Sequence, residues 1–378
     1  MDDIGEISNL KPVSAERCSP APLSRTASSP APATPGAAAG RPAPRVRVAM
    51  WATGGAGLAL STALLLRTGI PEILRLLEIA GWRLLWLAPI HLIPMALGAA
   101  GWRRLLRGTR APGLAYLTWA TTVREAVGGL LPASQVGGEV VGVRLLVRRA
   151  MTATTAGAAV VVQLTLWMIA QLVFASAGLV LLLGYSTAGR APRLVGLGML
   201  GGAAVTAAFV LVQHRWGVFG LIERVLAAIA GRDVLRAFGD PALLDRAIRA
   251  LYGDRRALAR CITSQLAAMF AGATELWVTL RLLGHPIGLR PALVVESLTM
   301  AIQSAAFFVP AGLGTQEGSF VLFGGAVGLP PQVALALSLA TRARQMLVGV
   351  PALGTWLLAE RWSLAERVPR RWSDPPGE

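Results

Sequence analysis

Apolar runs about as long as a bilayer is thick recur along most of this chain, and they constrain its fold more than any other feature. The first run begins near Val48 and is about twenty residues long, the length of one membrane-spanning helix. Further runs follow at 84–101, 113–131, 151–183, 194–213, 258–283, 291–309, 316–328 and 332–359. Only 15% of the residues are charged, and the mean hydropathy is +0.57. The sequence therefore predicts an all-α polytopic membrane protein.

Arginine clusters lie between the apolar runs and predict how the chain is oriented. The sequence has 36 basic and 20 acidic residues, a net charge of +16, and every basic residue except Lys11 is arginine. Nucleic-acid-binding proteins gather such charge along one polar face, whereas basic residues between membrane spans mark the cytoplasmic side. We therefore expect no nucleic-acid partner and assign the arginine groups to the cytoplasm. These groups are 41–47, 103–110, 144–149, 215–260 and 361–371.

Two apolar regions must enter the membrane and return if all these groups are to share one side. If 113–131 crossed fully, the arginines at 103–110 and 144–149 would lie on opposite faces, against the positive-inside rule. The region 291–331 is interrupted by Pro310 and several glycines, which favours a second hairpin. We predict about six full transmembrane helices and two re-entrant hairpins, about eight to nine membrane segments in total. The first hairpin enters from the cytoplasm and the second from the opposite face, so the two are inverted.

Composition also divides the chain into regions. Residues 1–44 are rich in Pro, Ala and Ser and almost without large apolar side chains, which is typical of a disordered tail. Residues 45–360 form the predicted transmembrane domain. Its polar loop at 214–257 is expected to be cytoplasmic and has the apolar spacing of amphipathic helices resting on a membrane surface. Residues 361–378 form a basic cytoplasmic tail, and the N-terminus is expected to be cytoplasmic because arginines precede the first span.

Two broken segments, one in each half of the chain, resemble each other. Residues 131–139 read Leu-Pro-Ala-Ser-Gln-Val-Gly-Gly-Glu and residues 309–317 read Val-Pro-Ala-Gly-Leu-Gly-Thr-Gln-Glu, each with a glutamate seven positions after the proline. Corresponding Pro- and Gly-broken segments in two halves point to a transporter's binding site, because exposed peptide groups persist at membrane depth only in a cavity. The candidate site residues are Pro132, Gln135, Gly137, Gly138, Glu139, Pro310, Gly312, Gly314, Gln316 and Glu317.

Glu139 and Glu317 are expected at or near membrane depth, where an unpaired charge costs a few kcal/mol or more and is usually functional. Arginine partners are available, because Arg144 follows Glu139 by five residues and Arg342 and Arg344 interrupt the last apolar run. The alternative is that both segments are Gly- and Pro-rich turns between close-packed helices. In that case the helix dipole favours the glutamates at helix N-termini.

Four further charged residues within apolar runs are less distinctive. Arg124 and Glu125 are neighbours and therefore lie on different faces of a helix, while Glu275 and Glu296 lie on two successive apolar segments. Buried polar packing and a functional role fit these four residues equally well.

Few features of the sequence are typical of an enzyme. The seven aspartates form no Asp-rich magnesium motif within the apolar runs, and no P-loop is present. His91, His214 and His285 occur singly without metal-ligand spacing, so we expect them to be interfacial or packing residues. Cys18 and Cys261 lie far apart and predict neither a disulfide framework nor a metal site. We therefore expect no catalytic residue, no metal and no cofactor.

The motifs resemble the lysylphosphatidylglycerol synthase transmembrane, or flippase-like, superfamily. The resemblance is carried by the run from Arg124 and Glu125 through the first broken segment to Arg144, and by Pro-Ala-Gly-Leu-Gly-Thr-Gln-Glu-Gly at 310–318 followed by Arg342. Within this superfamily, the motifs Gln-Val-Gly-Gly-Glu and Gly-Thr-Gln-Glu-Gly are most similar to those of the HpnL-like, hopanoid-biosynthesis-associated branch. The resemblance adds Glu125, Arg144 and Arg342 to the candidate substrate-binding residues.

This resemblance implies a multi-pass protein of the bacterial inner membrane that moves a lipid between leaflets or toward the outer membrane. The expected partners are the bilayer, a hopanoid or phospholipid substrate, and proteins of hopanoid biosynthesis or transport. Synthase relatives carry a soluble catalytic domain after the membrane part, and the residues after 360 leave no room for one, so we do not expect an aminoacyl transferase. The alternatives are a flippase for an aminoacyl-phospholipid or polyprenyl-linked sugar, an intramembrane enzyme, or a scaffold of lipid biosynthesis.

Overall fold

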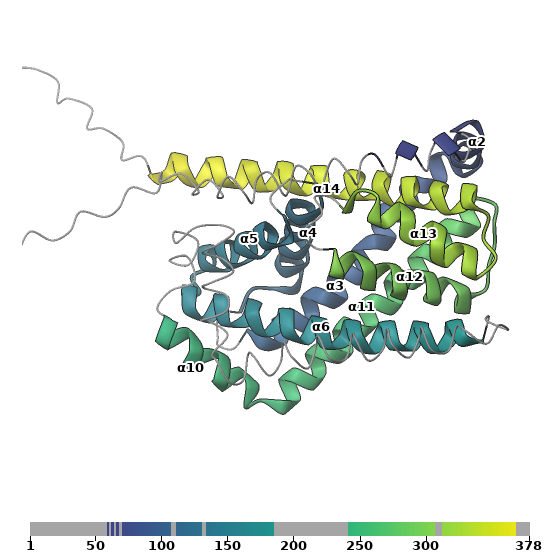
Figure 1. Ribbon diagram of the computed structural model, residues 1–378. Coiled ribbons are helices and arrows are strands. Elements are labelled where there is room, and N and C mark those ends of the chain that lie inside the picture. Colours follow the sequence, from purple (N-terminus) through teal and green to yellow (C-terminus); the bar gives the residue numbers. More distant parts are fainter. Residues whose placement is uncertain are drawn as a thin grey trace, which may run out of the picture. The chain divides into compact units, whose positions relative to one another are not determined.

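The computed structural model describes residues 70–106, 111–130, 134–184, 241–306 and 312–367, with a few positions between 59 and 67. All of them belong to the compact unit Ala39–Glu378. Every regular element in this part of the chain is a helix, which confirms the predicted all-α class there (Figure 1). The elements are α2 (Ile70–Ala80), the 3-10 helix η1 (Gly81–Trp86), α3 (Leu87–Leu105), α4 (Leu114–Leu130), α5 (Ser134–Arg148), α6 (Ala153–Leu183), α10 (Pro241–Tyr252), α11 (Arg255–Leu282), α12 (Leu289–Ala305), α13 (Thr315–Ala326) and α14 (Pro331–Arg367).

Three helices in the described part are long and apolar enough to cross a membrane. They are Ile70–Leu105, which combines α2, η1 and α3, then Ala153–Leu182 in α6 and Pro331–Arg361 in α14. These helices coincide with three of the predicted full crossings. Of two other predicted crossings, the one that begins near Val48 lies mostly outside the described residues and the one at 194–213 lies wholly outside them.

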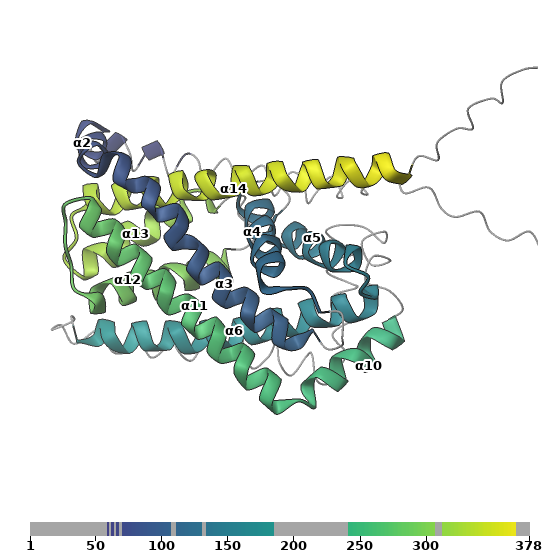
Figure 2. The same cartoon turned by 180° about the vertical axis from the view of Figure 1, so that it is seen from behind.

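Helix α11 differs from these three spans in composition. It has 28 residues and is therefore long enough, but it carries Arg260, Glu275 and Arg281 and is not apolar enough to qualify as a span by itself. It packs along α3, and the two helices lie side by side in Figure 2. The total of eight to nine membrane segments therefore stays a prediction.

Two helical hairpins form where re-entrant segments are predicted. Helices α4 and α5 pack against each other and make the first hairpin, and α12 and α13 make the second. Their helices have 17, 15, 17 and 12 residues. At about 1.5 Å per residue the longest measures about 25 Å, which is shorter than the roughly 30 Å hydrocarbon core of a bilayer.

The two hairpins open toward opposite ends of α14. At the open end of the first hairpin, Arg148 Nη1 donates to Glu360 Oε2 at 2.8 Å, near the C-terminal end of α14. At the open end of the second, Gly324 packs beside Ala334 in the first turn of α14. Each hairpin also contributes to a different hydrophobic core. This is the arrangement that an inverted pair of hairpins requires.

Part of the predicted polar loop packs on the protein instead of only resting at a membrane surface. Its residues 241–252 form α10, and the apolar side chains Leu244, Ile248 and Leu251 are buried in the same core as α6. Asp254 then accepts a hydrogen bond from the backbone N–H of Ala257 at 3.0 Å and caps α11. The apolar spacing of this segment therefore reflects contact with protein.

Large apolar side chains cover much of the outer surface of the described helices. Trp82 and Trp86 on η1, Ile93 on α3 and Val350 on α14 are all exposed. Such a surface suits a bilayer, since lipid chains solvate apolar side chains and tryptophans concentrate at the membrane interface.

Candidate functional site

Glu139 of the first hairpin is held by an arginine from the same hairpin. Arg124 on α4 donates from Nη2 to Glu139 on α5, and from Nη1 to Gln163 Oε1 on α6 at 2.9 Å. The Arg124 guanidinium also stacks 4.6 Å from the ring centroid of Trp102. Because Glu139 is 22% exposed, this pair is only partly removed from solvent or lipid headgroups.

Arg144 was expected to be available as the partner of Glu139, and the structure corrects this. Arg144 contacts Glu360 on α14 and its side chain is 60% exposed. Five residues along a helix correspond to a rotation of about 140° around its axis, so Arg144 and Glu139 project from different faces of α5.

Gly138 allows α5 to approach α4 closely. A Cβ atom at this position would lie 2.4 Å from the carbonyl oxygen of Arg124, and one at Gly142 would lie 2.7 Å from Arg124 Cδ. The glycines therefore have a packing role in this hairpin. Of the other predicted residues in this segment, Gln135 and Gly137 lie in the first turn of α5, and Pro132 lies outside the described residues.

Glu317 of the second hairpin is held more tightly, and its predicted partner Arg342 is correct. Glu317 Oε1 accepts from Arg342 Nε on α14 at 2.8 Å and from Ser338 Oγ at 3.3 Å. Glu317 Oε2 accepts from the backbone N–H of Gly314 at 2.8 Å. Gln316 donates to Ser338 Oγ at 3.0 Å. The side chain of Glu317 is only 4% exposed.

Backbone geometry before α13 requires the predicted glycines. Gly312 and Gly314 have φ values of +58° and +75°, in the left-handed region that other residues rarely adopt. This turn brings the N–H of Gly314 to the carboxylate of Glu317, which lies in the first turn of α13. Glu317 therefore caps its helix, as the turn alternative predicts, and also pairs with Arg342. Pro310 lies outside the described residues.

A third cluster, here called the central cluster, joins four helices around His91. His91 Nε2 on α3 lies 3.2 Å from Glu125 Oε2 on α4, and its Nδ1 lies 3.0 Å from Glu275 Oε2 on α11. Arg344 on α14 donates to Glu275 and lies 2.6 Å from His91 Nδ1. Outside these four helices, Glu296 on α12 interacts electrostatically with Glu275, Arg344 and His91. His91 was expected to be a packing or interfacial residue, and it lies instead between two carboxylates.

Two residues of the central cluster are close in sequence to the arginines that hold the two hairpin glutamates. Glu125 follows Arg124, the partner of Glu139, and Arg344 lies two residues after Arg342, the partner of Glu317. His91 and Arg344 lie near the middle of the candidate spans Ile70–Leu105 and Pro331–Arg361. Charges at such depth are costly and are functional candidates by default. Charged residues within apolar runs, namely Glu125, Glu275, Glu296 and Arg344, were the signals in the sequence that pointed to the cluster, whereas His91 carried none.

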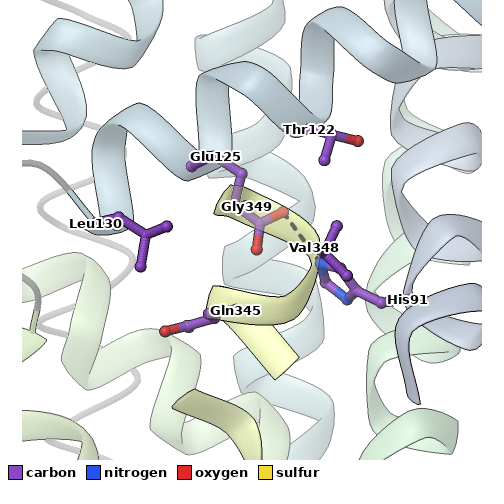
Figure 3. Close-up of a pocket in the computed structure, with 9 residues that line it drawn as sticks. His91, Thr122, Glu125, Leu130, Gln345, Val348 and Gly349 are labelled. Carbon is purple, nitrogen blue, oxygen red and sulfur yellow. Dashed lines mark hydrogen bonds and ion pairs between the residues drawn. The ribbon is translucent and has the colours of Figure 1, made fainter. Parts of the chain in front are cut away.

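Two cavities adjoin the central cluster. A small one of about 30 Å³ is bordered by His91 and Glu125, whose side chains meet in Figure 3. A larger groove of about 840 Å³ runs between α3, α4 and α14. Thr122 and Val348 line both cavities, so the groove and the polar cavity are adjacent. The groove is lined mainly by apolar side chains, among them Leu92, Leu114, Trp119, Leu347 and Pro351.

The described helices and their buried charges define a multi-pass α-helical membrane protein. A family model described as the lysylphosphatidylglycerol synthase TM region matches residues 55–352, more than half of the chain, and the protein therefore belongs to this family. Both hairpins and the central cluster lie inside the matched range, whereas Glu360 lies beyond it. No curated protein matches the sequence significantly. The predicted superfamily is confirmed, and the hopanoid branch stays a prediction.

Proposed function

We propose that this protein is a lipid transporter of the bacterial inner membrane that moves a hopanoid between leaflets and toward the outer membrane. The observation that carries the proposal is an apolar groove adjacent to a polar cavity beside a buried charge cluster. A molecule that fits such a site is apolar over most of its length and polar at one end. Membership of a lipid-related membrane family supports the same class of substrate.

The hairpin arrangement supports transport over catalysis. Two inverted hairpins that open toward opposite ends of the bundle offer access to one site from either side in turn. The hydroxyl groups in and just after the second broken segment donate hydrogen bonds to nearby backbone carbonyls. Thr315 donates to Gly312 O and Ser319 to Thr315 O. Neither is positioned beside a histidine that would activate it as a nucleophile. In this proposal the N-terminus and the basic ends of α3, α5 and α14 face the cytoplasm.

The test is the hopanoid content of separated inner and outer membranes from a deletion strain. The strain is complemented with the wild-type gene, with a Glu139→Gln and Glu317→Gln double mutant, or with Glu78→Gln, a control whose carboxylate is exposed on α2. We expect unchanged total hopanoid, a depleted outer membrane in the deletion strain, and rescue by the wild type and control only. Immunoblots of each membrane verify that the variants accumulate equally.

Other results would replace this proposal. A lower total with an accumulated precursor would assign the protein to synthesis, as an enzyme or a scaffold. Unchanged hopanoids in both membranes would identify another lipid as the cargo, such as an aminoacyl-phospholipid or a polyprenyl-linked sugar.

A further inference from the structure

The groove and the small cavity are adjacent and share the lining residues Thr122 and Val348, and their chemistry together restricts the lipid that they can take. The groove lies between two of the candidate spans and α4, and Leu92, Leu114 and Leu347 at its edge are exposed. In a bilayer, such a surface is surrounded by lipid chains. The groove volume of about 840 Å³ lies within the range of sites that enclose one small organic molecule.

The size of the polar cavity limits the group that can enter it. Its volume is about 30 Å³. A single water molecule needs about 10–15 Å³ of such space, so the cavity has room for about two water molecules or for a small polar group such as a hydroxyl or primary amine.

Among the described residues, the polar cavity is lined by one carboxylate, that of Glu125, together with His91 and the side-chain amide of Gln345, and by no arginine or lysine. The Glu125 side chain is 39% exposed, and its carboxylate pairs with His91 and interacts electrostatically with Arg344. The Thr122 hydroxyl donates to Thr118 O at 2.9 Å, so its proton is not available to a ligand. Arg344 is directed to Glu275 and does not line the cavity. Phosphate binding requires guanidinium, ammonium or backbone N–H donors, whereas this lining suits a group that donates hydrogen bonds.

We infer that this site binds a lipid whose polar end is a hydroxyl or primary amine group without phosphate, with Glu125 as the acceptor. The apolar body of the lipid lies in the groove between α3, α4 and α14. This inference rests on the proposed function for the claim that lipid is the cargo, and it adds the headgroup class. It excludes phospholipids and polyprenyl phosphates as ligands of this site.

Matched photoreactive probes test the inference. The full chain is reconstituted in phosphatidylcholine nanodiscs with a long-chain alkyl alcohol, the corresponding primary amine or the corresponding alkyl phosphate, each with a diazirine in the chain. Mass spectrometry then quantifies adducts on the groove-lining parts of α4 and α14. We expect the alcohol, the amine or both to label the groove about tenfold more than the phosphate. Equal or stronger labelling by the phosphate, or no labelling of the groove by any probe, would overturn the inference.

Three variants locate the labelling. Glu125→Gln is expected to reduce it about tenfold, because the ligand loses a hydrogen bond to a charged acceptor. Ala115→Trp fills the groove from an exposed position on α4 and should abolish it. Glu78→Gln makes the same chemical change as Glu125→Gln on an exposed site and should leave labelling unchanged. The headgroup preference of the wild type needs no variant, so misfolding of Glu125→Gln would not decide the outcome.

The amine and alcohol arms separate the two donor headgroups. A preference for the amine that Glu125→Gln abolishes identifies an ammonium ligand, whereas equal labelling identifies hydrogen bonding without charge pairing. If the probes show the preference but the deletion strain keeps a normal lipid distribution, the inference holds and the proposed function is wrong. If the phosphate labels equally while the outer membrane is still depleted, the proposed function holds and the inference is wrong.

Discussion

The two hairpins carry similar sequence segments and hold their glutamates in different ways. Glu139 pairs with Arg124 inside the first hairpin, whereas Glu317 pairs with Arg342 on the separate helix α14 and also caps its own helix. The glycines differ as well, since Gly138 allows close helix contact and Gly314 allows a left-handed turn. Similar sequence segments in the two halves of the chain therefore predict where hairpins form. The contacts of the surrounding helices then determine the role of each shared residue.

The largest effect expected from this difference is at Glu317. Glu317→Gln leaves Arg342 without its carboxylate in a buried site and weakens the cap at Gly314, so we expect a loss of about 3 kcal/mol in the free energy of unfolding. The measurement is unfolding of the purified protein in mixed detergent micelles. Adding Arg342→Met to Glu317→Gln should recover part of the loss, because the positive charge that faced the lost carboxylate is then removed as well.

A matched control for Glu317→Gln exists on α2. Glu72 and Arg75 form an exposed pair at 3.8 Å, and Glu72→Gln should change stability by less than about 0.5 kcal/mol. If the two glutamine variants were equally stable, the buried pair at Glu317 would contribute no more to the free energy of unfolding than a surface pair does.

Glycine substitution compares the two hairpins directly. Gly138→Ala should cost about 1–3 kcal/mol, because its Cβ would lie 2.4 Å from Arg124 O and would push α5 away from α4. Gly318→Ala on α13 meets nothing within 4 Å and should be neutral or stabilise by up to about 1 kcal/mol. The same unfolding assay reports both values. Equal effects would mean that contact between α4 and α5 is looser than the structure has it.

Hairpins and spans were predictable because their signals are local, whereas the central cluster was not. Apolar runs with Pro and Gly breaks identified both hairpins and three spans, and the interruption of the last run identified Arg342 and Arg344 as charged partners. His91, by contrast, is 34 positions from Glu125 and 184 from Glu275, and a single histidine in an apolar run carries no signal of either contact. Only tertiary packing of α3 against α4, α11 and α14 brings these groups together.

Glu139→Gln should have a smaller effect than Glu317→Gln, although the substitution is the same. Glu139 is partly exposed and lacks a backbone donor such as Gly314, and a glutamine at this position still offers an oxygen to Arg124. We expect a loss of about 1 kcal/mol, the contribution of one partly buried hydrogen bond. A cycle that combines Glu139→Gln with Arg124→Met measures the coupling between the two side chains. A loss as large as that of Glu317→Gln would show that the first hairpin is as tightly closed as the second.

The smallest effect is expected at Arg144, where sequence and structure disagree most. Its exposed side chain shares the carboxylate of Glu360 with Arg148, which is more buried and also donates to the carbonyl oxygen of Ala359 at 3.2 Å. Arg144→Gln should therefore change stability by less than about 0.5 kcal/mol, because Arg148 still pairs with Glu360 in this variant. Arg148→Gln should have a larger effect, because it removes the more buried of the two arginines. If Arg144→Gln destabilised the protein as much as Arg148→Gln, the two arginines would form one cooperative cluster with Glu360. The open end of the first hairpin would then depend on both of them for its attachment to α14.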